Sequence, residues 1–286
     1  MNKFQWKKFL RAGITSIFIL LGWFFLPAQN AANEELLSVF DYMKQNRLDS
    51  AEIALKAVLK NDPDNPVNPF LLNNLGTIQR RLGKRDEAIL SYTAALGTFP
   101  NQPVFLESRA SLFAEMGQPH NAIIDYSVLL SVNPNNQEAL YQRGLLYLQI
   151  KNTDLAEADF RKILELNPNS LYARNGLASV AKFRGDYEDA EKIYFYLIDK
   201  EPDNFNLYAG RAELYLLMHR PGKASDDINH AIHSAGDKSP NPYFYVIRYR
   251  VKLQLHEKES ALEDWKKAVA LGYKGEEEEE NRQTSF

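Results

Sequence analysis

The sequence predicts an all-α protein, a right-handed α-solenoid of about seven stacked helix-turn-helix repeats. The first observation is a period, because prolines recur at Pro100, Pro134, Pro168 and Pro202, each 34 residues after the one before. A fixed period of roughly 20 to 50 residues is typical of stacked repeat proteins. The second observation is that the segments between these prolines carry two short amphipathic patterns joined by a polar break. That pattern indicates two helices and a turn in each segment.

The composition fits a folded body and excludes several classes of function. The chain has 286 residues, of which 45% are hydrophobic and 25% are charged, as in globular proteins. Its net charge of −3 provides no positive field for general nucleic-acid binding, so nucleic acid is not an expected partner. The sequence has no cysteine, which excludes disulfides, thiolate metal sites and cysteine nucleophiles.

The N-terminal residues have the charge pattern of an export signal. Four basic residues stand within residues 1–11, none of residues 12–33 is charged, and residues 17–26 are the apolar centre of this stretch. Two alternatives stay open for residues 1–28. They are a cleaved signal peptide, or a signal anchor in which residues 12–28 hold the protein in the membrane. Either one predicts an exported protein of the periplasm or cell envelope, with membrane contact only through this segment if it is uncleaved.

Small residues set the register of the repeats in residues 32–275. The predicted units are 32–65, 69–102, 103–136, 137–170, 171–204, 205–238 and 242–275. Position 20 of every unit is alanine: Ala51, Ala88, Ala122, Ala156, Ala190, Ala224 and Ala261. Position 8 is also small in five of the seven units: Gly76, Ala110, Gly144, Ala178 and Ala212, against Val39 and Tyr249. Two antiparallel helices approach closely only where the side chain at their contact is small.

Larger residues and turn residues complete each unit. Position 24 carries a bulky apolar residue that is expected to fill the space between one unit and the next: Leu55, Tyr92, Tyr126, Phe160, Tyr194, Ile228 and Trp265. Gly83, Gly117, Gly185 and Asn46 stand where the first helix must end in a left-handed residue. A proline at position 32 of five units cannot continue the second helix.

Each unit of 34 residues thus tends to have small residues at positions 8 and 20, a bulky and often aromatic residue at position 24 and a proline at position 32. This pattern resembles the tetratricopeptide repeat. The resemblance covers residues 32 to about 275 and is best in the second to fifth units. It implies a non-enzymatic scaffold that binds a peptide or a protein surface in a concave groove lined by the first helices. Residues 276–286 begin with five glutamates and are predicted to be an acidic disordered tail.

The resemblance also implies which residues meet the partner, since positions 2, 5, 9, 12 and 13 of each unit point into the groove. The candidates for a partner-binding groove are Phe70, Asn73, Arg80, Arg81, Glu107, Glu138, Tyr141, Leu145, Gln149, Tyr172, Asn175 and Lys182. Rings bury area and amides pair with a peptide backbone, as a peptide-binding groove requires. Packing of these rings between neighbouring units is an equal alternative. A second hypothesis is an adaptor for envelope polysaccharide or peptidoglycan, since aromatic faces also stack on sugar rings.

The residues that carry catalysis in other proteins do not form a recognisable set. His230 and His233 lie one turn apart, with Asp226 a turn earlier, but ligands on one exposed helix do not converge on a metal ion. The sequence has no glycine-rich phosphate loop, His-Glu-x-x-His or Gly-x-Ser-x-Gly motif. We therefore expect no enzyme activity, no cofactor and no metal, and a metal enzyme built on His230 and His233 is the rival hypothesis.

Overall fold

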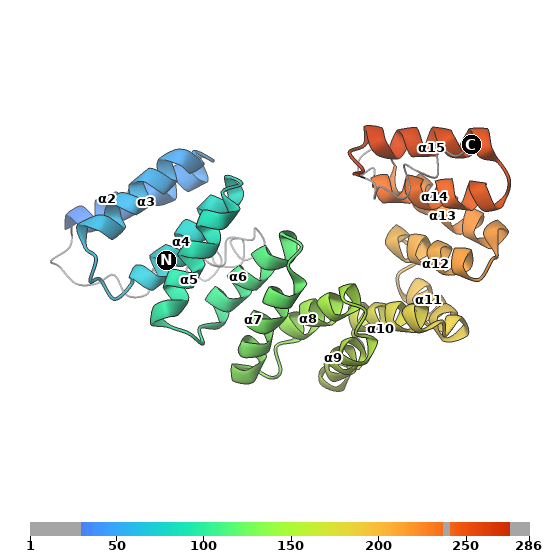
Figure 1. Ribbon diagram of the computed structural model, residues 1–286, viewed down its shortest axis with the longest axis horizontal. Helices are drawn as coiled ribbons and strands as arrows, with labels where there is room; N and C mark the ends of the chain where they lie inside the picture. The colour runs from blue at the N-terminus through green and yellow to red at the C-terminus, as the bar shows by residue number, and fades with distance from the viewer. Residues whose placement is uncertain (1–29, 237–240, 275–286) are drawn as a thin grey trace, which may run out of the picture. The chain divides into compact units, whose positions relative to one another are not determined.

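The computed structural model describes residues 30–236 and 241–274, and these residues form fourteen α-helices (Figure 1). The predicted all-α repeat fold is confirmed. The chain divides into two compact units, residues 1–150 and 151–286, and the division falls inside the fourth predicted repeat. The predicted export segment, 1–28, and the predicted acidic tail, 276–286, lie outside the described residues.

Three helix pairs and one further helix make up the described part of the first unit, drawn from blue to green in Figure 1. The helices are α2 (Asn30–Lys44), α3 (Leu48–Asn61), α4 (Asn68–Arg81), α5 (Arg85–Thr98), α6 (Pro103–Glu115), α7 (Pro119–Val132) and α8 (Gln137–Gln149). The partners α2 and α3, α4 and α5, and α6 and α7 pack against each other, and each pair packs against the next.

The second unit repeats this arrangement with one leading helix and three pairs. The helices are α9 (Thr153–Leu166), α10 (Leu171–Arg184), α11 (Tyr187–Lys200), α12 (Phe205–Leu217), α13 (Pro221–Ala235), α14 (Pro242–Gln254) and α15 (Lys258–Ala270). The three pairs after α9 are α10 with α11, α12 with α13 and α14 with α15. The helices α10, α12 and α14 are therefore the first helices of successive repeats. Among the helices of the described residues, none combines the length and apolar character needed to cross a bilayer.

The small residues lie at helix contacts, as the register predicts. All seven alanines of position 20 have a relative exposure of 0%. In three repeats the aromatic residue at position 24, which is Tyr92, Phe160 or Tyr194, packs on a glycine of a neighbouring helix. A methyl group on Gly76 would lie 2.6 Å from the ring of Tyr92, and one on Gly210 would lie 2.7 Å from the hydroxyl of Tyr194. Since helix interiors disfavour glycine, its presence here is explained by the close approach of the ring.

The first helix of every repeat ends in a left-handed residue. Gly83, Gly117 and Gly185 have positive φ angles, as does Asn46. The same backbone angle occurs at three residues without the freedom of glycine: Lys151, His219 and His256. The turn is therefore imposed by the packing of the two helices even where the sequence does not favour it.

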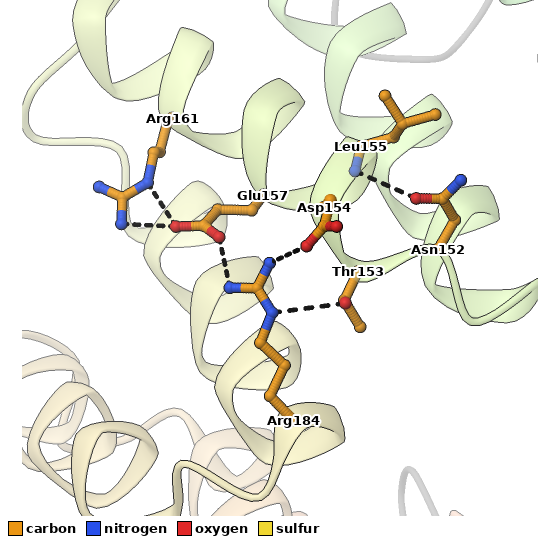
Figure 2. Close-up of polar contacts among 7 residues, drawn as sticks. All are labelled: Asn152, Thr153, Asp154, Leu155, Glu157, Arg161 and Arg184. Atoms are coloured by element: carbon orange, nitrogen blue, oxygen red, sulfur yellow. Dashed lines mark hydrogen bonds and ion pairs between the residues drawn. The ribbon is translucent and has the colours of Figure 1, made fainter.

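Charged side chains also join neighbouring repeats. Figure 2 shows the guanidinium of Arg184, at the end of α10, between Asp154 and Glu157 of α9. Its Nη2 lies 2.5 Å from Asp154 Oδ1, and Glu157 also accepts from Arg161 Nε at 2.6 Å. These hydrogen bonds lower the pKa of Glu157. The N-terminus of α9 is capped by Asn152, whose Oδ1 accepts from the Leu155 amide at 3.3 Å.

Candidate functional site

A pocket of about 850 Å³ lies in the second unit, on the side formed by the first helices of its repeats. We refer to it as the α10–α12–α14 pocket. Its walls are Lys182 and Phe183 of α10, Tyr187 of α11, Glu213, Leu216 and Leu217 of α12, and Tyr243, Arg250, Leu253 and Gln254 of α14. A volume of this size is within the range of clefts that bind ligands in other proteins.

The pocket exists because successive first helices present the same face. On α12 the lining residues are spaced at i, i+3 and i+4, beginning at Glu213, and on α14 the same spacing begins at Arg250. Residues at this spacing share one side of a helix. The sixth and seventh repeats therefore contribute equivalent positions, numbers 9, 12 and 13 of their 34 residues, and the fifth repeat contributes positions 12 and 13.

A polar bridge crosses the pocket from α10 to α14. Lys182 Nζ donates to Glu213 Oε2 at 2.8 Å, and the hydroxyl of Tyr243 donates to the other oxygen of the same carboxylate. Glu213 thus joins three helices through one side chain. Gln254 Nε2 adds a bond to the backbone oxygen of Leu216 at 3.3 Å.

The bridge has defined protonation states at neutral pH. Burial alone would lower the pKa of Lys182, but the neighbouring Tyr194 and Glu213 outweigh it and raise the pKa above its ordinary value. Burial and the charge of Glu213 raise the pKa of Tyr243 well above that of a free tyrosine. Lys182 is therefore a cation and Tyr243 a neutral donor. With Arg250, the pocket holds two cations and one carboxylate beside an apolar surface.

The apolar surface of the pocket is open to solvent. Phe183 is 53% exposed and Leu217 is 45% exposed, although other apolar residues of the same two helices are buried. Leu216, one position before Leu217, is buried in the core of the α12 and α13 pair. The exposed side chains are therefore those that the helix packing does not use. Exposed apolar groups beside satisfied polar groups are typical of protein-binding surfaces.

The predicted groove residues of the first unit lie in varied environments. Phe70 is half-buried, with its ring centre 5.1 Å from that of Phe105 and 6.0 Å from that of Phe99. Asn73 is only 3% exposed, and its Oδ1 has no hydrogen-bond partner within the part of the chain that the structure describes. Arg81 Nη2 donates to Asn46 Oδ1 at 2.8 Å, which ties it to the turn of the preceding repeat.

Two pairs of charged groups are brought together across the first helices of this unit. Arg80 Nε donates to Glu115 Oε2 at 2.9 Å, which joins α4 to α6. Glu107 of α6 and Glu138 of α8 are near enough for Glu138 to raise the pKa of Glu107, an effect that adds to that of burial. Both glutamates remain accessible to solvent, so the burial of Glu107 is partial.

The remaining predicted residues stand on one helix of each unit. In α8, Leu145 and Gln149 are exposed and Tyr141 is half-buried. In α10, Tyr172 is exposed and Asn175 is half-buried. Lys182 is the one predicted residue that lines the α10–α12–α14 pocket.

Most of the pocket was missed by the sequence prediction, which took residues only from the second to fifth repeats. Glu213, Tyr243, Arg250 and Gln254 belong to the sixth and seventh repeats, whose consensus residues are weaker. A signal was available, since all four occupy position 2, 9 or 13 of their repeats, the positions already assigned to the groove.

The two histidines of the rival hypothesis do not converge with other ligands. The ring of His230 lies 4.1 Å from that of Tyr208, and His230 Nε2 is 3.5 Å from Ser234 Oγ. The structure places no group of three or more His, Cys, Asp or Glu side chains at metal-binding distances within residues 30–236 and 241–274.

Two segments of the sequence match models of the same protein family. Models described as tetratricopeptide repeat match residues 41–103 and residues 138–170. Among curated protein sequences, none matches the chain significantly.

Solved structures give a longer match. The crystal structure of a tetratricopeptide repeat protein from Parabacteroides merdae is 45% identical and superposes with a TM-score of 0.81, over 85% of this chain and 93% of that one. Two more distant structures share the fold. PilF of Pseudomonas aeruginosa is 17% identical, with a TM-score of 0.53 over 70% of this chain and 89% of its own. YrrB, described as having an unusual peptide-binding site, is 16% identical, with a TM-score of 0.51 over 72% of this chain and 98% of its own.

Proposed function

Because the chain belongs to the tetratricopeptide-repeat family, we propose that it is a non-enzymatic scaffold of the cell envelope that binds a peptide or protein segment in the α10–α12–α14 pocket. Proteins of this family act as protein-interaction scaffolds. The observation that carries the proposal is the convergence of one face of three successive first helices on a single pocket.

The chemistry of the pocket fits an extended peptide. Phe183, Leu217 and Leu253 provide an apolar surface on which a side chain can be buried. Lys182, Arg250 and Gln254 place donors at its margins, where they can meet peptide carbonyls or carboxylates. Glu213 holds the side chains of Lys182 and Tyr243 in place, which limits the side-chain entropy lost when a partner binds.

The proposal is tested with a defined ligand. A random peptide library is displayed and selected on the immobilised protein, and the Kd of each selected peptide is measured by titration. Leu217→Ala is expected to weaken binding by roughly tenfold, since removing an apolar anchor from an interface costs about 1 to 2 kcal/mol. Leu262→Ala is the matched control, because Leu262 is similarly exposed, at 42%, but stands on α15 outside the pocket.

Three results would count against the proposed peptide-binding function. An equal loss of peptide affinity in both variants, or no loss in either, would show that the pocket is not the binding site. Selection of no peptide, together with binding of soluble peptidoglycan fragments that Leu217→Ala abolishes, would replace the peptide by the glycan of the second hypothesis.

We also propose export for the body of the protein, on the basis of the basic and apolar residues of segment 1–28. Cell fractionation followed by intact-mass measurement tests it. A mature mass that lacks about 28 residues in the envelope fraction supports a cleaved signal, and a full-length mass in the membrane fraction supports an anchor. A full-length mass in the cytoplasm would overturn the proposed location.

A further inference from the structure

We propose that the first unit contacts a lipid bilayer through an exposed aliphatic surface on its second helices, α3, α5 and α7. This inference rests on the export proposed above, in its membrane-anchored form. It uses none of the residues that line the α10–α12–α14 pocket, which stays available to a protein partner. We refer to the surface as the aliphatic face. It consists of Ile53 and Ala57 of α3, Leu90 and Ala94 of α5, and Ile124 and Val128 of α7.

The three largest residues of the aliphatic face occupy one position of the repeat, number 22. The relative exposure is 71% for Ile53, 69% for Leu90 and 61% for Ile124. Successive residues of an α-helix are about 100° apart, so position 22 lies on the opposite side of the helix from positions 20 and 24. Those two positions face the core, as Ala88 and Tyr92 show with an exposure of 0%. The core therefore makes no use of position 22.

The exposed sides of α5 and α7 also lack charge around this position. No Asp, Glu, Lys or Arg occurs in α5 from Ala88 to Thr98. Within α7 the only such residue is Asp125, which is buried and accepts from Arg109 Nε at 2.8 Å. Exposed helix faces of soluble proteins normally carry charged and polar residues. An uncharged aliphatic surface that continues over three repeats indicates a contact with a protein or a membrane.

The aliphatic face is confined to the first unit. In the four later repeats position 22 is occupied in turn by Ala158, Lys192, Asp226 and Glu263, all of them exposed. Both units are built from the same repeat, so the fold does not require isoleucine or leucine at this position. The larger aliphatic residues thus stand in the three repeats that follow most closely, along the sequence, on the apolar segment 17–26.

That apolar segment identifies the bilayer as the partner of the aliphatic face. It ends at Leu26, and α2 begins at Asn30. Four residues of extended chain span at most about 14 Å. A membrane anchor formed by residues 12–28 therefore keeps α2 near the lipid surface, together with α3, which packs on α2. A short tether of this kind gives an effective concentration on the order of 1 mM, so even a weak contact between the aliphatic face and lipid is populated.

The residue types of the aliphatic face fit lipid better than protein. Protein interfaces are enriched in aromatic residues and arginine, and the aliphatic face contains neither. Leucine, isoleucine and valine enter the hydrocarbon region favourably. Lys60 is exposed seven residues after Ile53, on the same side of α3. Its ammonium group can reach a lipid phosphate while its stem lies on the apolar surface, as in other interfacial membrane contacts.

Because the sequence has no cysteine, a single dye can be placed on the aliphatic face. Leu90→Cys in the full chain is labelled with a nitrobenzoxadiazole dye and reconstituted into vesicles of phosphatidylethanolamine and phosphatidylglycerol. Lys192→Cys, at the same repeat position of the second unit, is the matched control. Interfacial apolar surfaces are buried by about 5 to 10 Å, so lipids with brominated acyl chains should quench the dye at position 90 by roughly half or more and the dye at position 192 by less than about a tenth.

A second series tests whether the quenching depends on the aliphatic side chains. The dye is attached at Ala94→Cys, and Leu90→Asn is combined with Ile124→Asn. Most of the quenching should be lost, although the chain still floats with the vesicles because residues 1–28 are intact. The control combines Leu155→Asn with Leu262→Asn, which are 45% and 42% exposed in the second unit, and should leave the quenching unchanged. An unchanged midpoint of thermal unfolding shows that both double variants keep the fold.

The possible results distinguish this inference from the proposals on which it rests. If the chain floats with the vesicles but neither dye is quenched, the anchor stands and the aliphatic face does not touch lipid. Equal quenching of both dyes would mean that the chain adsorbs without preference for this face. A dye at position 90 that is shielded from water but not quenched by brominated lipid would show that a second copy of the chain covers the face. A full chain that does not float would overturn both the anchor and this inference. None of these results affects the peptide selection that tests the α10–α12–α14 pocket.

Discussion

Arg211 and Asp227 form a two-point ion pair that joins the two helices of the sixth repeat. Arg211 Nε lies 2.7 Å from Asp227 Oδ2, and Nη2 lies 2.8 Å from Oδ1. Both side chains are largely buried. The guanidinium also lies 4.9 Å from the ring centre of Phe195 in the preceding repeat. A single arginine therefore connects three helices by charge, hydrogen bonds and ring stacking.

Removing one member of this pair is expected to destabilise the second unit strongly. Asp227→Asn leaves a largely buried guanidinium without its counter-ion, and such a loss typically costs about 3 kcal/mol. The measurement is the urea midpoint of unfolding. Asp226→Asn is the matched control, since Asp226 is the preceding residue of the same helix but is exposed, and its loss should change stability by less than about 0.5 kcal/mol. Equal effects of the two substitutions would contradict the assigned role of the pair.

This ion pair recurs at fixed positions of the repeat, so the repeat register could have predicted it as well as the small residues. Arginine stands at position 7 and aspartate at position 23, sixteen residues apart, also in the pairs Arg109 with Asp125 and Arg248 with Asp264. The alanines could be predicted because every repeat meets the same steric requirement. The ion pair recurs only in some repeats, so its signal is a spacing between two residues, which a search for invariant positions does not detect.

The glycine and aromatic contacts provide a second prediction. Gly76→Ala would place a methyl group 2.6 Å from the ring of Tyr92, which is itself fully buried and cannot move aside without disturbing the core. Overpacking of this kind typically costs about 1 to 3 kcal/mol. At Gly97, on the partner helix α5, a methyl group meets no described atom within 4 Å. Gly97→Ala should therefore stabilise the protein by about 0.5 kcal/mol, since alanine is the better helix former.

Thermal unfolding of both glycine variants distinguishes the two effects. Gly76→Ala is expected to lower the stability of the protein and Gly97→Ala to raise it, although both replace glycine by alanine in the two helices of one pair. A rise in stability for Gly76→Ala would show that Tyr92 does not need the space that the glycine leaves.

The candidate site was harder to predict than the fold, for a physical reason. Backbone packing depends on residue size at fixed positions, but the availability of a groove residue depends on its neighbours. Asn73 has the polarity of a contact residue and is buried, whereas Arg81 is drawn to Asn46 of the preceding repeat. The bridge from Lys182 to Tyr243 through Glu213 spans three repeats, so no single repeat contains the signal for it.

Glu52 provides a prediction of pH dependence in the first unit. This carboxylate is 4% exposed and lies 2.7 Å from the ammonium groups of both Lys56 and Lys84, with Gln79 Nε2 at 3.2 Å. Burial alone would raise its pKa, but the hydrogen bonds from these three residues outweigh it and lower the pKa to about 2. Because the pKa is lower in the folded state, the charged form of Glu52 stabilises the fold above about pH 4.5. That contribution, on the order of 2 to 3 kcal/mol, is lost as the pH falls from about 4.5 towards 2.

Urea unfolding between pH 6 and pH 3 measures this dependence. Glu52→Gln is expected to be less stable than the original chain at pH 6 and to lose less stability on acidification. Glu107→Gln provides a contrast of opposite sign, because burial and Glu138 raise the pKa of Glu107. Ionisation of Glu107 opposes folding, so Glu107→Gln should stabilise the protein at pH 7 and lose this advantage as the pH falls. Parallel pH profiles for the original chain and Glu52→Gln would contradict the role given to Glu52.

The left-handed turn at His219 provides the last prediction. Its φ angle of 52° disfavours any residue with a β-carbon, whereas Gly185 occupies the equivalent position of the preceding repeat. His219→Gly relieves a backbone strain of about 1 to 2 kcal/mol, and part of this gain is offset because glycine loses more backbone entropy on folding. The net expectation is a gain of roughly 0.5 to 1 kcal/mol in the free energy of unfolding, measured by urea denaturation. His233→Gly is the control, because His233 is exposed within α13, where glycine should cost about 0.5 kcal/mol. Destabilisation by both substitutions would mean that the His219 side chain contributes more to the fold than its backbone strain costs.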